Sequence, residues 1–592
     1  MLKEYTNLLY RNQKRNEIYY FIFFNILSIF FETFSIALIP IFIAYIIKPE
    51  IISLIPIDQV RIYIENLEYI TSIYLGVLVF VIIFTLRNMF NYFLIKYQLK
   101  LQVNFNYQIK KMFFSLYLFS PFELLNNYNL SEILNNVEEQ TTDYVSNFFL
   151  IIKFGKDILL FSSIFFLLLY ADYLSTLVVM AILLIVLLLY IRFFRKKMQV
   201  IGEQLLRTKG LLFKWINQSL GMIKEIKVSR KENFVIEKFL ANVSLFEEAK
   251  MKLNLIQVIP SIIFEIIFVL LILAVVVVVV SVDIISMLPV LSLYVVASVR
   301  LLPIVSKFGS YITSLKSSYP SVSLLNSEMK KLEGSSNKNQ KEELENIQND
   351  ISLNDKISLK ELSFQYKKID KRVLDEINLE INKTDMVVFV GKTGSGKSTI
   401  INLISGLLVP TKGVILADGK NINTNLSKWQ KKIGLLTQHN YLLDDTIQNN
   451  IVFLHGENNL NNERLDQCIK LSGLDELIKE LPNGLDTIVG DKGNFLSSGQ
   501  IQRIALARVL YKDPEILILD EFTSALDQDT EKSILQNIKK YQSEKNKTVI
   551  IISHKLGPLK HCNKIVLLKE GKIIDQVNYE DYKKKYLIID EI

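Results

Sequence analysis

The stretch GKTGSGKST has residue types and spacing that suit the binding of phosphate groups. The apolar run Val387–Val390 precedes it, so the loop is expected to leave a strand and to open a helix near Ser398. Glycines let backbone N–H groups approach phosphate oxygens, and a helix N-terminus adds positive potential. Lys397 is expected to reach the β- and γ-phosphates, and Ser398 to bind Mg²⁺. The predicted phosphate loop comprises Gly391, Lys392, Thr393, Gly394, Ser395, Gly396, Lys397, Ser398 and Thr399. A chance glycine-rich turn is the alternative interpretation.

Two further apolar runs end in polar residues that extend this chemistry. The run Ile516–Leu519 leads into Asp520 and Glu521, which are predicted to serve as an Mg²⁺ ligand and as a general base for an attacking water. The run Val549–Ile552 leads into a Ser-His pair, and open α/β sheets place ligands where such strands end. His554 is therefore predicted to sense the γ-phosphate or to orient the base.

The elements that would position these residues divide the chain into an apolar half and an ordinary soluble half. Half of the 592 residues are apolar, yet 22% are charged. Six apolar stretches reach the length of about 20 residues that a membrane-spanning helix requires. They lie at 18–47, 70–95, 148–170, 173–192, 255–282 and 284–304. We expect a multi-domain protein in which an all-α domain of six transmembrane helices precedes an α/β nucleotide-binding domain of the P-loop type.

Charge and cysteine usage narrow the location. The loop after the fourth span is rich in Lys and Arg, whereas the segment between the first two spans is not, so both termini are predicted to be cytoplasmic. The two cysteines, Cys468 and Cys562, lie in the soluble half and indicate a reduced compartment. The net charge of +8 comes without a basic patch interleaved with aromatic residues, so no nucleic-acid partner is expected.

With LSSGQ at 496–500 placed ahead of the ILILDE strand, the chain resembles the ATP-binding cassette (ABC) exporters. The resemblance implies that Tyr366 stacks on adenine, that Gln438 joins the catalytic and Mg²⁺-binding groups and couples the site to the membrane part, and that 524–527 cross a dimer interface. It also implies that Ser497 and Gly499 complete the ATP site of the opposite subunit. Ser498 stands where the family usually has glycine, which could slow turnover by crowding the γ-phosphate. The long interior connections are expected to end in coupling helices near Phe122–Asn136 and Met222–Asn233.

A polar segment low in aromatic residues, 333–356, is predicted to be a flexible linker. It would separate a transmembrane domain at 1–332 from a nucleotide-binding domain at 357–592. The chain has a single phosphate loop, so a working unit needs a second copy, most simply as a homodimer that binds ATP and Mg²⁺.

Ionisable residues inside apolar spans are costly and are candidates for function. Cations outnumber anions among them, which would favour an anionic headgroup in a cavity. The alternative is that Glu32 and Glu265 pair with Arg87 and Arg300 to hold helices together, while the lysines reach the membrane interface. The candidates for a substrate cavity are Glu32, Arg87, Glu265, Arg300 and Lys307. Lys153, Lys156 and Asp157 are further ionisable residues of the spans.

Short patches of the membrane half resemble bacterial flippases of lipid-linked oligosaccharides: FETFSIALIP at 31–40, Arg87, SEIL at 131–134, Glu265 and RLLPIVSK at 300–307. Lys307 stands where that group tends to have arginine. The resemblance implies an ATP-driven flippase in the inner membrane that moves a lipid-linked oligosaccharide or a related anionic glycolipid among membrane lipids. Export of a peptide, lipid or drug is the alternative, and an ATP-gated channel or sensor is a third hypothesis. The completeness of the hydrolytic residues favours a pump over a gate.

Overall fold

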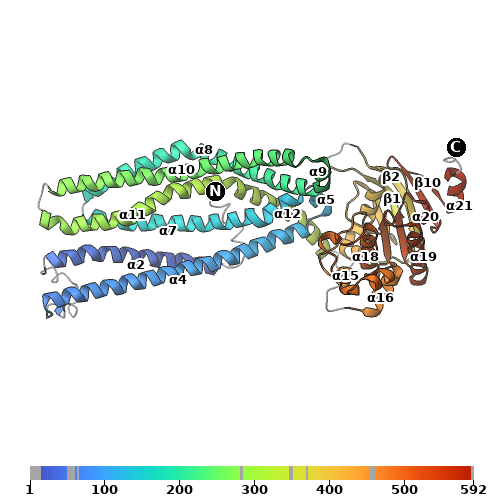
Figure 1. Ribbon diagram of the computed structural model, residues 1–592, viewed down its shortest axis with the longest axis horizontal. Helices are drawn as coiled ribbons and strands as arrows, with labels where there is room; N and C mark the ends of the chain where they lie inside the picture. Colours follow the sequence, from blue (N-terminus) through green and yellow to red (C-terminus); the bar gives the residue numbers. More distant parts are fainter. Residues whose placement is uncertain are drawn as a thin grey trace. The chain divides into compact units, whose positions relative to one another are not determined.

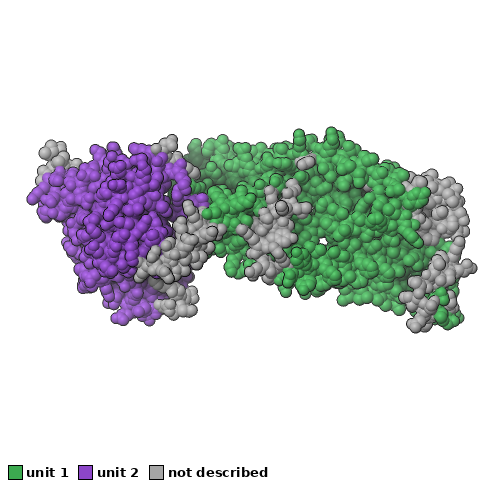
Figure 2. Space-filling view, turned by 180° about the vertical axis from the view of Figure 1, so that it is seen from behind, with its two compact units in different colours: residues 1–120, 126–334 green, residues 121–125, 335–592 purple. Residues whose placement is uncertain are grey.

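The computed structural model describes 15–47, 49, 61–62, 64, 66–171, 173–280, 284–345, 351–367, 371–453 and 460–587. The chain divides into two compact units. Unit 1 comprises Met1–Ser120 and Asn126–Gly334, and unit 2 comprises Pro121–Leu125 and Ser335–Ile592 (Figure 2).

Long helices build unit 1 (Figure 1). The six that contain the predicted spans are α2 (Arg15–Ile47), α4 (Tyr69–Leu118), α7 (Thr141–Ala171), α8 (Tyr173–Gly221), α10 (Glu232–Val280) and α11 (Ile284–Ser317). At a rise of about 1.5 Å per residue, the 50 residues of α4 extend about 75 Å, well beyond a hydrocarbon core of about 30 Å. The polar second half of this helix therefore projects into water.

Four stretches among the described residues are long and apolar enough to cross a membrane. They are Asn16–Ile47, Tyr69–Leu118, Thr176–Phe194 and Ser292–Gly334. The third and fifth predicted spans lie in α7 and α10, which carry charged residues such as Lys156, Asp157 and Glu265 within their apolar stretches. Large apolar side chains are exposed on α2 and α4, for example Phe30 and Met89, as expected for a surface that faces lipid.

Helix α11 is the central helix of this bundle, because it packs against α2, α7, α8 and α10. The core between these helices contains Ile36 from α2, Ile164 from α7, Phe264 from α10, and Ala297 and Leu301 from α11. The small side chain of Ala297 allows close approach of neighbouring helices.

Short helices occupy the predicted coupling segments. The first segment contains α5 (Phe122–Leu125), α6 (Leu130–Leu134) and the π-helix η2 (Asn135–Gln140), and the second contains α9 (Ile223–Ser229). Residues 121–125, which include α5, belong to unit 2 rather than to unit 1.

The segment predicted to be a flexible linker, 333–356, is helical in its first part. Helix α12 (Tyr319–Glu345) continues through it, and β1 begins at Lys356, while 346–350 lie outside the described residues. Residues 340–345 read QKEELE and have high helix propensity, which explains why the helix continues. The segment has no periodic apolar residues, so no pattern in the sequence indicated a helix.

Unit 2 contains an antiparallel and a largely parallel sheet. The antiparallel sheet has the order β2-β1-β4-β5, formed by β1 (Lys356–Phe364), β2 (Leu374–Asn382), β4 (Lys412–Ala417) and β5 (Lys420–Asn421). The second sheet has the order β10-β9-β3-β8-β7-β6. Its strands are β3 (Met386–Val390), β6 (Ile433–Leu436), β7 (Ile516–Asp520), β8 (Thr548–Ile552), β9 (Lys564–Lys569) and β10 (Lys572–Val577). Neighbours from β9 to β6 are parallel, and β10 is antiparallel to β9.

Both faces of the parallel sheet are buried, which explains why its strands are continuous apolar runs. Successive side chains point to opposite faces, so Leu517 and Leu519 join one core while Ile516 and Ile518 join the other. The longer helices of this unit are α13 (Lys397–Ile404), α16 (Asn462–Leu471), α18 (Ser498–Tyr511) and α19 (Gln528–Lys545). The shorter ones are α14 (Leu426–Lys431), α15 (Ile447–Val452), α17 (Asp475–Glu480), α20 (Leu556–Leu559) and α21 (Tyr579–Tyr582), with short turns η3 (Ile422–Asn425), η5 (Gly484–Asp486), η6 (Asp491–Gly493) and η7 (Lys583–Leu587). A helical domain followed by this α/β domain confirms the predicted fold class.

Candidate nucleotide-binding site

The parallel sheet brings four distant chain segments to one edge. Strands β3, β8, β7 and β6 are consecutive neighbours and run in the same direction, so their carboxyl ends lie side by side. The phosphate loop follows β3, His554 follows β8, Glu521 follows β7, and Gln438 follows β6. This edge is where open α/β folds bind their ligands.

The phosphate loop has a backbone that only glycine adopts readily. Gly394 and Gly396 have φ values of 82° and 103°. The Lys397 ammonium donates to the carbonyl oxygens of Gly391 at 2.6 Å and of Lys392 at 3.0 Å, so its side chain curls back under the loop. The buried Ser395 hydroxyl has no hydrogen-bond partner among the described residues. A loop with open backbone, a held ammonium and an unpartnered hydroxyl fits the phosphates of a nucleotide.

The side chains of Gln438 and His554, from two strand ends, meet at the carboxylate of Glu521, which follows a third strand. The Gln438 amide Nε2 donates to Glu521 Oε2 at 2.6 Å, and His554 Nε2 lies 3.3 Å from Glu521 Oε1. Glu521 itself has a φ of 47°, an uncommon conformation for a residue other than glycine. Its backbone N–H donates to the Ile552 carbonyl of β8 at 3.1 Å, which helps to hold this conformation. The carboxylate is thus oriented from both sides.

Burial shifts the pKa values of Asp520 and Lys397, and the neighbouring charges modify both shifts. Burial, together with the adjacent charge of Glu521, raises the pKa of Asp520 to about 6, although Lys397 opposes the shift. Burial also lowers the pKa of Lys397, against the attraction of Glu521 and Asp520. A carboxyl that is costly to ionise without a cation suits a metal ligand, because a bound cation would favour its charged form.

The remaining predicted nucleotide ligands lie around α13. Ser398 is exposed in the first turn of this helix, and Thr399 is buried behind it. The Tyr366 hydroxyl lies 3.5 Å from Thr399 Oγ1, and its ring packs edge-on against Phe364 at a centroid distance of 4.8 Å. Tyr366 is thereby held near the loop, where the predicted stacking on adenine would take place.

The LSSGQ segment begins a different helix. Ser497 is the N-cap of α18, and its hydroxyl and Gln500 form a reciprocal capping box. Gly499 lies so close to the Ala525 carbonyl that an added Cβ would sit 2.9 Å from it. Ser497 and Ser498 are exposed, and no hydrogen bond among the described residues joins 497–500 to the phosphate loop. Their predicted role in a partner's site stays a prediction.

Some residues of this region were not predicted from sequence. Gln502 of α18 donates to the Ser524 hydroxyl at 3.0 Å, and Lys555 binds the Thr523 carbonyl and the buried Glu531. The position of Lys555 directly after His554 was the one sequence feature that could have pointed to it. Glu531 lies in an ordinary amphipathic helix and carries no local signal.

Three candidate residues of the membrane half, Glu32, Arg87 and Arg300, lie near one another, but they do not converge on one group as at the sheet edge. Glu32 pairs with Arg300 at 3.5 Å between α2 and α11, as the structural alternative expected. Arg87 does not pair with Glu265; its guanidinium donates to Ser35 Oγ at 3.2 Å and lies over the Phe84 ring.

The remaining two candidates, Glu265 and Lys307, are exposed, and among the described residues their side chains contact no charged partner. Lys156 donates to Ser28 Oγ at 3.1 Å, and Asp157 accepts a hydrogen bond from Tyr311 at 2.7 Å.

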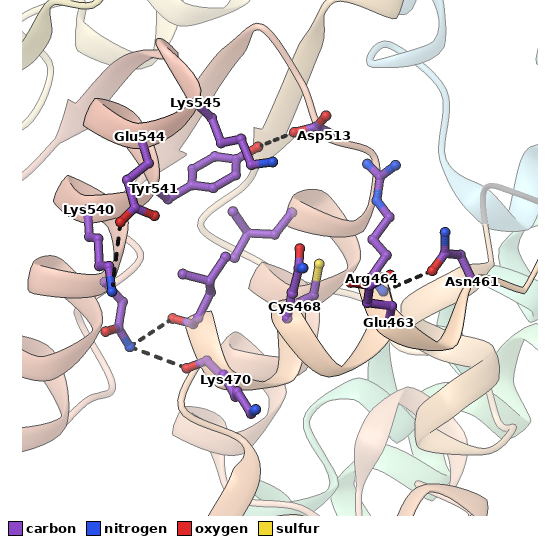
Figure 3. A pocket seen from close by; sticks show the side chains of 14 residues that line it. Asn461, Glu463, Arg464, Cys468, Lys470, Asp513, Lys540, Tyr541, Glu544 and Lys545 are labelled. Atoms are coloured by element: carbon purple, nitrogen blue, oxygen red, sulfur yellow. Dashed lines mark hydrogen bonds and ion pairs between the residues drawn. The ribbon is translucent and has the colours of Figure 1, made fainter.

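Unit 2 also has a pocket of about 590 Å³ between α16 and α19 (Figure 3). Side chains such as Arg464 and Tyr541 face it, and Tyr541 donates to Asp513 at 2.9 Å. None of the predicted nucleotide-site residues lines this pocket, so it is separate from the sheet edge.

Comparisons with known proteins show which proteins unit 2 is similar to. Residues 374–524 match the family model described as ABC transporter. The leukotoxin translocation ATP-binding protein LktB of Mannheimia glucosida is 39% identical over 202 residues, which are 34% of this chain and 28% of that protein. An ATP-dependent lipid A-core flippase of Legionella pneumophila (strain Paris) is 42% identical over 196 residues, 33% of each chain. The matched segment spans a third or less of these relatives. ATP together with Mg²⁺ is the cofactor pair of such a domain.

A solved structure extends the likeness to the whole fold. The structure of a bacterial Atm1-family ABC exporter with ATP bound has a TM-score of 0.75 to this chain and covers 96% of both chains. At 20% sequence identity, this likeness concerns the fold. The chain therefore has the nucleotide-binding domain of the ABC transporter family and the fold of an ABC exporter half-transporter.

Proposed function

We propose that this chain is an ATP-driven exporter or flippase that acts as a homodimer in the inner membrane, with both termini in the cytoplasm. The observation that carries the proposal is the hydrogen-bonded cluster of Gln438, Glu521 and His554 beside the phosphate loop. The same chain has helices long and apolar enough to cross a membrane. The site of ATP hydrolysis would thus lie in the same chain as a membrane-spanning domain, so that the two could be coupled.

Each residue of the cluster has a chemical role in this proposal. Glu521 accepts the proton of the attacking water, while Gln438 and His554 hold its carboxylate in place. Lys397 neutralises phosphate charge. Ser398, Gln438 and Asp520 would hold Mg²⁺, which neutralises charge on the phosphates.

A second copy completes the site in this proposal. Ser497 and Ser498 are exposed at the start of α18, whose N-terminus is suited to a phosphate. Because these residues form no hydrogen bond to their own phosphate loop among the described residues, they are free to serve the loop of a partner. Two sites with Glu521 would then form in a homodimer.

The leading substrate class is a lipid-linked oligosaccharide or a related anionic glycolipid. Exposed Lys307 beside the last span supplies a cation that has no acidic partner among the described residues, and Arg87 keeps a charge inside the bundle. One of the relatives is named as a lipid A-core flippase, which supports a lipid substrate. Export of a peptide or protein is the second candidate, because other relatives are named as toxin translocation proteins.

Transport in sealed proteoliposomes tests the substrate. A fluorescent polyprenyl-pyrophosphate glycan, a fluorescent phospholipid and a labelled peptide would be offered in parallel, with E521Q as the blank. We expect ATP-dependent movement of the glycan. Movement of the peptide or phospholipid alone would overturn the glycolipid assignment while leaving an exporter. ATP hydrolysis with no movement of any probe would favour the gated channel or sensor.

A lysine variant tests the cationic surface. K307Q should lower the rate of glycan transport several-fold, because it removes a charge that faces an anionic headgroup. The matched control is K360Q, which neutralises an exposed lysine of β1 in the other unit. Equal transport by the two variants would remove Lys307 from the substrate path.

A further inference from the structure

One lysine joins the two loops that carry the proposed base and its histidine. The Lys555 ammonium donates to the Thr523 carbonyl at 2.6 Å and to Glu531 Oε2 at 3.2 Å. Thr523 lies two residues after Glu521, and Lys555 directly follows His554. The side chain of Lys555 therefore ties the turn after β7 to the turn after β8.

The carboxylate that holds this lysine is deeply buried. The Glu531 side chain is 8% exposed, and its second oxygen, Oε1, has no hydrogen-bond partner among the described residues. A Cβ added at Gly557 would lie 2.5 Å from this oxygen, so the glycine permits the close approach of the next turn. Water cannot solvate a buried carboxylate well, so the carboxylate depends on its charged partner. Loss of that partner would leave an unpaired buried charge.

Local hydrogen bonds fix both ends of the bridge. The Lys555 N–H donates to Ser553 Oγ at 2.9 Å, and Ser553 is buried. The Ser524 N–H donates to the Glu521 carbonyl at 3.1 Å, so a displacement of the Thr523 carbonyl moves the backbone of the base. Glu521 already has a strained backbone, with φ at 47°, and needs such support.

We propose that Lys555 and Glu531 are positioning residues for ATP hydrolysis, which hold Glu521 and His554 at their mutual distance of 3.3 Å. The inference rests on the proposed ATPase function. Lys555 contacts the backbone behind the base rather than the phosphate loop, so it acts on the hydrolytic step and leaves nucleotide binding unchanged.

Steady-state ATPase kinetics in nanodiscs test this assignment. K555M should lower kcat about ten- to a hundredfold with an unchanged KM for ATP, because a small displacement of a base has effects of that size. K555R should restore most of the rate, since it keeps the charge and the donors. The matched control is K560M, which removes an exposed lysine of the same segment and should retain the wild-type rate.

A double variant separates positioning from folding. K555M leaves Glu531 without its charged partner, so thermal stability should fall, and E531Q in the same chain should recover it. We expect the double variant to melt like the wild type and still to hydrolyse ATP slowly. Recovery of both stability and kcat would overturn the proposal, as would a wild-type kcat in K555M. If the wild type itself hydrolyses no more ATP than E521Q, the proposed function fails, and the pair loses the reaction that it would serve.

Discussion

The carboxyl edge of the parallel sheet and the interior of the helical bundle organise charged residues in opposite ways. At the sheet edge, residues from segments more than a hundred positions apart converge on Glu521. In the bundle, Glu32 pairs with Arg300 and Arg87 donates to Ser35, whereas the exposed Glu265 and Lys307 contact no charged partner among the described residues. The difference shows that strand order brings polar residues onto one carboxylate, whereas helix packing leaves the charges of the bundle in separate contacts.

The largest expected effect is at the sheet edge. H554A should lower kcat for ATP about a hundredfold, because the imidazole at 3.3 Å orients the Glu521 carboxylate. ATP binding should be retained, since His554 follows β8 and the phosphate loop follows β3. Phosphate release and nucleotide binding would be measured together.

The matched control for this variant is H561A, which removes a partly buried histidine of the same region. If both variants lose activity equally, the loss reflects folding. Full activity of H554A would show that the convergence at the sheet edge has no catalytic purpose.

The next effect is a pH dependence of the apparent affinity for Mg²⁺. Burial and Glu521 raise the pKa of Asp520 to about 6, so its carboxyl is charged above this pH and neutral below it. Because Mg²⁺ requires the charged form, its apparent affinity in the presence of ATP should fall about tenfold per pH unit below about pH 6. A titration of Mg²⁺ between pH 7.5 and 5, with D520N as the blank, measures this. An affinity that is flat down to pH 5 would contradict the role of Asp520.

A smaller effect is expected in the bundle. R300Q should lower the free energy of unfolding by about 1 kcal/mol, because polar contacts between membrane helices contribute about that much. Its partner Glu32 has a side chain that is only 12% exposed and would be left without its cation. The charge-swapped chain E32R/R300E should melt close to the wild type in nanodiscs. A swap that melts lower than either single variant would show that the two residues do not pair.

The smallest effect is expected at Glu265. E265Q should change the melting temperature little, within about 0.5 kcal/mol of stability, because the side chain is exposed and has no charged partner among the described residues. A large loss of stability would show that this carboxylate belongs to the packed interior, and the comparison would need to be redrawn.

The sequence indicated which residues lie together at the sheet edge more readily than which lie together in the helical bundle, for a physical reason. A buried parallel strand is a short apolar run, so the residue after it is known to lie at the carboxyl edge, as for Asp520, Glu521 and His554. The strand before Gln438 has four residues with a glycine among them, and a family resemblance was needed to find that residue.

Three features could not be predicted from these patterns. The contacts of Lys555 and Glu531 depend on how a helix and two turns pack, which no local pattern encodes. In the bundle, α4 and α10 have no one-sided apolar pattern, so the positions of Arg87 and Glu265 relative to the neighbouring helices could not be predicted from sequence. The helix over 333–345 arises from propensity without an apolar stripe.

The most direct test of the account is ATP hydrolysis by the wild-type protein in lipid nanodiscs, measured beside E521Q and beside E476Q, an exposed acid of α17. We expect a clear wild-type rate that E476Q retains and that E521Q lowers about a hundredfold or more, with ATP still bound. Equal rates in the wild type and E521Q would contradict it, because the carboxylate on which Gln438 and His554 converge would then not be the base.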